Sequence, residues 1–179
     1  LEFNDTHHMG ISFGKIGNIF EDKGNFDKAV YYYNLAYEEY KELSEKLWMA
    51  HRLGDLGIVY YKKGDYNKAI QFLNESINIQ NGNGLDKRLL WNMTTLSLIS
   101  KGLNVEYDVM EIKTLIKKNA DIGEELNYYI YQLLEDSSYL ETAYNQVQEK
   151  TSAMDDGAKF LSYPIPKAIV EEYNKVFKK

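Results

Sequence analysis

The sequence predicts an all-α fold, a right-handed superhelical solenoid of antiparallel helix hairpins, because one segment recurs with its small and aromatic residues in register. Residues 17–30 reappear 40 residues later as residues 57–70. The matched positions are Gly17 and Gly57, Phe20 and Tyr60, Gly24 and Gly64, Phe26 and Tyr66, and Ala29 and Ala69. A fixed period of this kind is typical of helical repeat arrays, in which each unit buries a face against its neighbours.

The spacing within each copy predicts two helices joined by a tight turn. Phe13 and Phe20 recur at helical spacing, which indicates one apolar helix face. Gly24 follows a last turn that contains lysine, so it is expected to end the first helix in a left-handed conformation. Gly17 and Ala29 are small enough to let the two antiparallel helices cross closely. The second copy repeats each signal 40 residues later.

These residues carry a family resemblance. Leu56, Gly57 and Tyr60, followed by the run from Lys63 to Ile70, resemble the tetratricopeptide repeat (TPR), and the first copy matches from Ile16 to Val30. The resemblance covers residues 10–80. The period of 40, against the usual period of about 34, is similar to the long repeats of kinesin light chain, LGN-type polarity adaptors and bacterial regulatory proteins.

We expect one solenoid domain over residues 1–179, about four hairpins and a capping helix. Its parts are repeat 1 (8–46), repeat 2 (47–84), two degenerate repeats (85–119 and 121–153) and a C-terminal cap (155–179). The degenerate repeats are expected to hold helices at 86–101, 107–118, 124–134 and 139–153. A turn-rich break is expected at 81–84, and Ser137 or Ser138 is expected to cap the helix at 139–153. Pro164 and Pro166 predict a break before a final helix at 167–177.

The composition disfavours several function classes. The net charge of −6, without a basic stripe, disfavours nucleic-acid binding. No apolar run is long enough to predict a membrane span. The absence of cysteine fits a reducing compartment, and we expect a cytoplasmic protein. Because the first residues align with the tail of a second helix, we expect the chain to continue a preceding repeat. An exposed apolar end would then favour homo-oligomers, through Leu1, Phe3, Met9 and Ile11.

The residue types that carry catalysis or bind metal do not gather at any spacing that chemistry requires. His7 and His8 point about 100° apart on a helix, and there is no His-Glu-x-x-His motif and no cysteine ligand. We expect this histidine pair to be solvated. We therefore predict no metal, no cofactor and no enzymatic activity in this chain.

The TPR resemblance implies that the first helix of each hairpin lines a groove, with the residues outside its packing face turned toward a ligand. The candidate groove residues are Lys15, Asn18, Asp22, His51, Asp55, Ile58, Tyr61, Lys62 and Asn92. The TPR type that holds the C-terminal carboxylate of a chaperone is disfavoured, because Asp55 stands where that type carries asparagine. A carboxylate there would repel the ligand.

The predicted groove is compatible with two functions. The first is a protein–protein interaction module that binds a peptide or partner-protein segment, as the C-terminal part of a larger bacterial regulatory or signalling protein. The alternative is a peptide-sensing regulatory domain that controls an attached output domain. That alternative needs asparagine and a cation in register on successive groove helices, which Asn18 and Asn92 supply in part.

Overall fold

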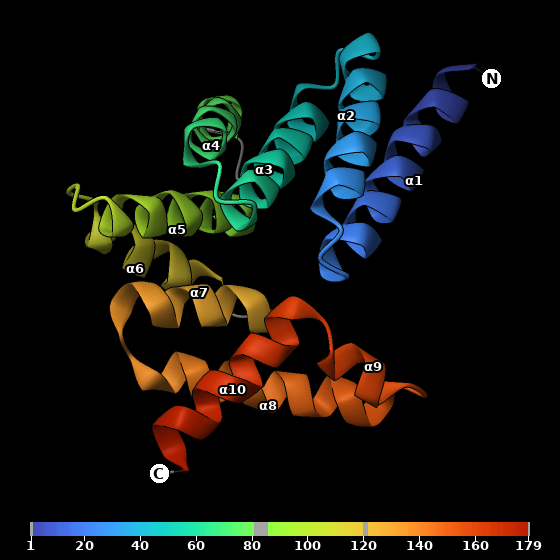
Figure 1. The fold of residues 1–179 in the computed structure, drawn as a ribbon. Coiled ribbons are helices and arrows are strands. Elements are labelled where there is room, and N and C mark those ends of the chain that lie inside the picture. The colour runs from blue at the N-terminus through green and yellow to red at the C-terminus, as the bar shows by residue number, and fades with distance from the viewer. Residues whose placement is uncertain (1, 81–85, 120–121, 179) are drawn as a thin grey trace. The chain divides into compact units, whose positions relative to one another are not determined.

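The computed structural model describes residues 2–80, 86–119 and 122–178, and their regular structure is α-helical, which confirms the predicted all-α class (Figure 1). The chain divides into two compact units, residues 1–118 and residues 119–179. Each unit is described by itself. The division into repeats stays a prediction, and the break expected at 81–84 lies outside the described residues.

The first unit is built from helix hairpins. Its helices are α1 (Glu2–Asp22), α2 (Phe26–Glu42), α3 (Lys46–Lys62), α4 (Tyr66–Gln80), α5 (Asp86–Gly102) and α6 (Val109–Lys118). α1 packs against α2 and α3 against α4, and α2 also packs against α3 (Figure 1). α5 contacts α3, α4 and α6, so α3 lies between other helices on more than one side.

Both hairpin turns have the predicted geometry. Gly24 and Gly64 adopt φ values of 74° and 78°, the left-handed region that glycine enters without a steric penalty. The side chain of Asn25 then accepts a hydrogen bond from the backbone of Lys28, at the start of α2. Asp65 does the same for Lys68 at the start of α4. Equivalent residues therefore end the first helix and begin the second in both copies.

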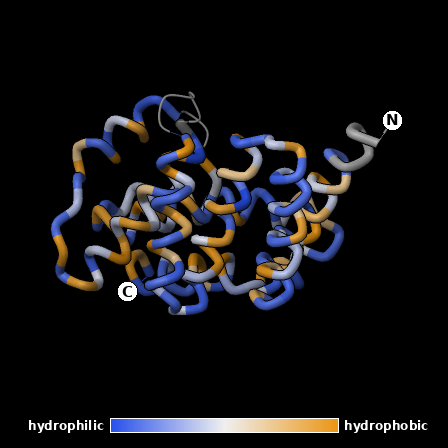
Figure 2. The backbone as a smooth tube through the Cα atoms, turned by 90° about the horizontal axis from the view of Figure 1, so that it is seen from above, coloured by the Kyte–Doolittle hydropathy of each residue, from blue (hydrophilic) through white to orange (hydrophobic). Residues whose placement is uncertain are grey.

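The close helix crossings are also as predicted. A Cβ atom added at Gly57 would lie 2.6 Å from Cγ of Leu73, and one at Gly17 would overlap the ring of Tyr33. Hydrophobic and hydrophilic residues alternate along the helices of the chain trace (Figure 2). One core cluster consists of Ala29, Tyr33, Leu56 and Val59, and a second of Ile58, Ala69, Leu73 and Ile99.

The second unit contains α7 (Glu124–Leu134), α8 (Ser137–Ala153), α9 (Gly157–Leu161) and α10 (Pro164–Phe177). α7 and α8 form a hairpin, and α10 packs on α8 around Ala143, Val147 and Ile169. Three details correct the sequence prediction. Asp136, rather than Ser137 or Ser138, caps α8 by accepting from the backbone of Ser138. The short helix α9 was not expected. α10 begins at Pro164 because a first turn tolerates proline.

Candidate partner-binding site on the first helices

Three of the predicted groove residues lie exposed on α1. Lys15, Asn18 and Asp22 occupy positions i, i+3 and i+7 of the helix, so they share one face. The small residues Gly14 and Gly17 of the same helix instead lie against the side chains of neighbouring helices. α1 therefore has an exposed polar face, and a different face of the helix packs against its neighbours.

The equivalent residues of α3 are buried. Asp55, the counterpart of exposed Lys15, is 6% exposed, and Ile58, the counterpart of exposed Asn18, is 5% exposed. Ile58 packs in a core cluster with Leu73. The difference arises because α3 packs against α2, α4 and α5. The same repeat position thus faces the solvent in one copy and other helices in the next.

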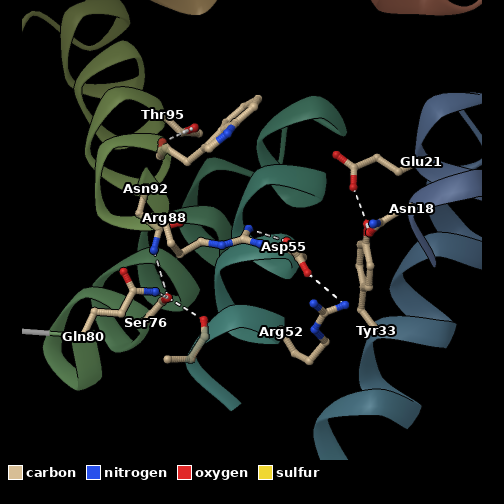
Figure 3. A network of polar contacts seen from close by, with 12 residues as sticks. Asn18, Glu21, Tyr33, Arg52, Asp55, Ser76, Gln80, Arg88, Asn92 and Thr95 are labelled. Atoms are coloured by element: carbon tan, nitrogen blue, oxygen red, sulfur yellow. Dashed lines mark hydrogen bonds and ion pairs between the residues drawn. The ribbon is translucent and has the colours of Figure 1, made fainter. Parts of the chain in front are cut away.

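The carboxylate of Asp55 stands between two guanidinium groups (Figure 3). Nη1 of Arg88, from α5, donates to Oδ1 of Asp55 at 2.5 Å, and Nη1 of Arg52 lies 3.2 Å from Oδ2. The side chains of Arg52 and Asp55 are 10% and 8% exposed, and that of Arg88 is 24% exposed. The sequence contains two arginines and nineteen lysines. Both arginines of the chain therefore contact one carboxylate. Arginine suits this largely buried position better than lysine, because a guanidinium is planar and less strongly hydrated than an ammonium group.

The guanidinium of Arg52 packs against Gly14 of α1 and the ring of Tyr33 of α2. A side chain at Gly14 of α1 would overlap Nη1 of Arg52. Cζ of Arg52 also lies 5.7 Å from the centre of the Tyr33 ring, a cation–π distance. We call Arg52, Asp55 and Arg88 the arginine cluster; it brings together α3 and α5, with α1 and α2 packed around it.

A second charged pair joins α1 to α3. Nζ of Lys62 lies 2.7 Å from Oε1 of Glu21, and the two side chains are 7% and 13% exposed. The hydroxyl of Tyr33 lies 2.5 Å from Oε2 of Glu21 and 2.8 Å from Oδ1 of Asn18 (Figure 3). Burial raises the pKa of Tyr33, and the negative charges of Asp55 and Glu21 raise it further. The hydroxyl therefore stays protonated and acts as a donor.

Asn92 is engaged inside the first unit. It is fully buried, and its Nδ2 donates to Oγ of Ser76 at 2.9 Å (Figure 3). Ser76 in turn donates to the backbone carbonyl of Ala50 at 2.6 Å, and Gln80 donates to Ser76 at 2.9 Å. These bonds tie α5 and α4 to the start of α3, so Asn92 has a structural partner already.

His51 lies beside the arginine cluster and is half-buried. Burial lowers the pKa of its imidazole to about 4, and the positive charges of Arg88 and Arg52 contribute in the same direction. Its buried Nε2 has no hydrogen-bond partner among the described residues. His51 is therefore neutral at pH 7 and adds no charge to the cluster.

The first two helix hairpins match a known protein family. Residues 9–81 match the family model described as tetratricopeptide repeat. These residues are a TPR region. The match includes both copies of the repeat; it begins within α1 and contains the whole of α2, α3 and α4. No curated protein and no solved structure gives a significant match to the chain.

TPR regions generally mediate protein–protein interactions, because stacked hairpins present extended surfaces rather than catalytic constellations. Within the described part of the chain, no group of three or more histidines and carboxylates could hold a metal ion. None of the described helices is both long and apolar enough to cross a membrane. The long form of the repeat stays a prediction.

The fold of the first unit leaves only some of the predicted groove residues accessible. By the exposure of the whole residue they divide into exposed (Lys15, Asn18, Asp22), half-buried (His51, Tyr61, Lys62) and buried (Asp55, Ile58, Asn92), and the side chain of Lys62 alone is 7% exposed. The buried ones would reach a partner only if helices moved apart. Their role in binding stays a prediction, whereas their role in packing is visible in the contacts above.

The sequence reasoning overlooked Arg52 and Arg88, although a signal was present: they are the two arginines of a chain that otherwise uses lysine. It also treated Asp55 as a free negative charge that would repel a carboxylate, whereas two guanidiniums neutralise it. The predicted solvation of the histidine pair is wrong for His7. His7 is half-buried, with Nδ1 2.8 Å from the carboxylate of Glu45.

Proposed function

We propose that the first unit, which contains the TPR region, binds a segment of a partner protein along the side formed by its first helices, α1, α3 and α5. The observation that carries the proposal is the polar face of α1, where Lys15, Asn18 and Asp22 are exposed together. Arg88 adds a partly accessible cation from α5. A face of mixed charge suits a peptide or helix segment with polar groups of its own, because such groups orient the ligand.

The same proposal includes the setting that the sequence suggests, a larger bacterial regulatory or signalling protein of the cytoplasm. Its support is the resemblance over residues 10–80 and the absence of cysteine. The alternative of a peptide-sensing domain draws less support. Asn92, which that alternative needs for gripping a peptide backbone, is buried and bonded to Ser76.

The test compares two charge swaps that leave the net charge unchanged. The first, Lys15→Glu with Asp22→Lys, alters the exposed face of α1. The second, Glu38→Lys with Lys41→Glu, reverses an exposed ion pair on the second helix α2. A partner is first identified by crosslinking and mass spectrometry on the wild-type chain, and its affinity for each variant is then measured by biolayer interferometry.

We expect the α1 swap to weaken binding at least tenfold and the α2 swap to leave it within twofold. The reverse pattern would show that the second helices carry the interface. A third variant, Ile19→Glu, changes a 50% exposed apolar residue on α1. If it alone abolished binding, an apolar contact on α1 would be the working surface, and the mixed-charge face would not be.

A further inference from the structure

The arginine cluster carries an excess of positive charge. Arg52 and Arg88 contribute two positive charges and Asp55 one negative charge, while His51 beside them is neutral at pH 7. The whole chain, by contrast, has a net charge of −6. A surplus cation that is largely removed from water is unfavourable unless an anion compensates it. Among the side chains that the structure describes, the cluster is therefore one negative charge short of neutrality.

The cluster also has unused hydrogen-bond donors. A guanidinium carries five N–H donors in a fixed fork. The carboxylate of Asp55 accepts a hydrogen bond from one nitrogen of Arg88, whereas its contact with Arg52 is an ion pair in which Oδ2 has no hydrogen-bond partner among the described residues. Nε of Arg52 is buried without a hydrogen-bond partner among the described residues. The side chain of Arg88 is 24% exposed, more than twice the exposure of Arg52 or Asp55. Arg88 is thus the member of the cluster that a ligand reaches first.

We propose that the arginine cluster accepts a carboxylate from the bound segment, so that the first-helix side prefers an acidic peptide. The proposal deepens the function proposed above and rests on it. The carboxylate pairs with the free N–H groups of Arg88, where a two-pronged contact is geometrically favoured. Asp55 does not oppose this contact, because Arg52 and Arg88 compensate its charge.

Two properties would distinguish ligand binding by Arg88 from a purely structural role of this residue. It depends on charge rather than on shape, so it weakens as added salt screens the ions. It also places a negative charge near His51, whose low pKa is due in part to the positive charges of Arg88 and Arg52. A bound carboxylate offsets those charges and raises the pKa of His51.

The probes are fluorescently labelled peptides, and the readout is anisotropy. Ac-(Gly-Glu)4-NH2 offers side-chain carboxylates, Ac-(Gly-Gln)4-NH2 offers none, and Ac-(Gly-Gln)4-OH offers a terminal carboxylate only. We expect the first peptide to bind the wild-type chain at least tenfold more tightly than the second. The third shows whether a terminal carboxylate serves as well as a side chain. Equal binding of all three, or no binding of either carboxylate peptide, would overturn the proposal.

Arg88→Gln is the informative variant, because it leaves Arg52 and Asp55 as a neutral pair and so keeps the cluster balanced. We expect it to reduce the preference for the glutamate peptide to less than twofold, and Arg88→Lys to retain part of it. Lys113→Gln on α6, an exposed residue, makes the same change of net charge elsewhere and should retain the preference in full. An unchanged preference in Arg88→Gln would overturn the proposal.

Nuclear magnetic resonance of the histidine side chains gives a second readout. On saturation with the glutamate peptide, the pKa of His51 should rise from about 4. A peptide that binds without moving His51 would show that it docks away from the cluster. The two proposals can also fail separately. If the α1 charge swap abolishes partner binding but Arg88→Gln does not affect it, the first-helix site stands and the acidic ligand is wrong.

Discussion

The two copies of the repeat in the TPR region share a backbone but not an environment. In both, a glycine of the first helix, Gly17 or Gly57, lies against a side chain of the second helix, and the turn ends at a left-handed glycine. Yet Lys15 is exposed where its counterpart Asp55 is 6% exposed. The repeat motif determines how two helices cross, whereas the neighbouring helices determine which of the other residues are buried.

The apolar residues show the same contrast. Ile19 of α1 is 50% exposed, and its counterpart Val59 of α3 is fully buried against Ala29, Tyr33 and Leu56. α3 meets the second helix of the first copy, α2, on the face that carries Val59. The equivalent face of α1 leaves Ile19 largely exposed. Matched substitutions at equivalent positions should therefore have unequal effects, and they test the comparison directly.

The largest difference is expected for Asp55→Ala against Lys15→Ala. Removing Asp55 leaves Arg52 and Arg88 close together and uncompensated, and breaking a buried ion pair in this way costs roughly 3–5 kcal/mol. Lys15 is exposed, so its replacement should change the free energy of unfolding by less than about 0.5 kcal/mol. Urea unfolding followed by circular dichroism measures both. Similar costs at the two positions would refute the contrast between the copies.

Val59→Ala against Ile19→Ala should give the next largest difference. Burial of a whole valine side chain stabilises a fold by about 1.5–3 kcal/mol, and Val59 loses much of this when it is shortened. Ile19 is half exposed already and should lose well under half as much. Thermal unfolding of both variants provides the check. A larger loss at Ile19 would contradict the contrast, because the half-exposed side chain would then stabilise the fold more than the buried one.

Gly57→Leu should overpack the crossing of α3 and α4 and cost roughly 1–3 kcal/mol, since its Cβ would already lie 2.6 Å from Cγ of Leu73. Gly102→Leu is the matched control at the end of α5, where an added Cβ meets nothing within 4 Å. Differential scanning calorimetry of the two proteins distinguishes them. An unchanged melting temperature for Gly57→Leu would contradict the close crossing.

The sequence was a good guide wherever a local signal decides the structure. Gly24 and Gly64 mark helix ends because left-handed backbone favours glycine, and the small residues at 17 and 57 mark crossings because nothing larger fits. The bounds of α7 agree with the predicted 124–134 for the same reason, since apolar spacing is a local property. The start of α10 was missed because proline interrupts a helix but is accepted in a first turn.

The candidate site was harder to predict, because burial on a first helix depends on residues far away in the chain. Periodicity placed Asp55 and Ile58 outside the packing face of α3, but α5 adds a second packing face that one repeat does not encode. Arg88 lies 33 residues from Asp55, so no spacing rule within a repeat could pair them. In the composition, the one sign of this cluster was that the chain contains only two arginines.

His51 should make the stability of the fold depend on pH. Its pKa is lowered to about 4 by burial and by the two arginines, against 6.5 in the unfolded chain. As the pH falls from about 6.5 toward 4, the unfolded chain takes up a proton that the folded chain does not, so stability decreases over this window. His51→Gln should flatten that decrease relative to the wild-type chain. Urea unfolding of both proteins at several pH values is the test.

The packing of α5 on α3 and the preference for an acidic ligand both depend on Arg88 being held by Asp55. A double-mutant cycle measures this contact directly, using the free energies of unfolding of Asp55→Ala, Arg88→Ala and the double variant. The 2.5 Å contact at a carboxylate only 8% exposed predicts a coupling energy of at least about 1 kcal/mol. Costs that add to within about 0.3 kcal/mol would contradict the account, because they would show that α3 and α5 are not joined through this pair.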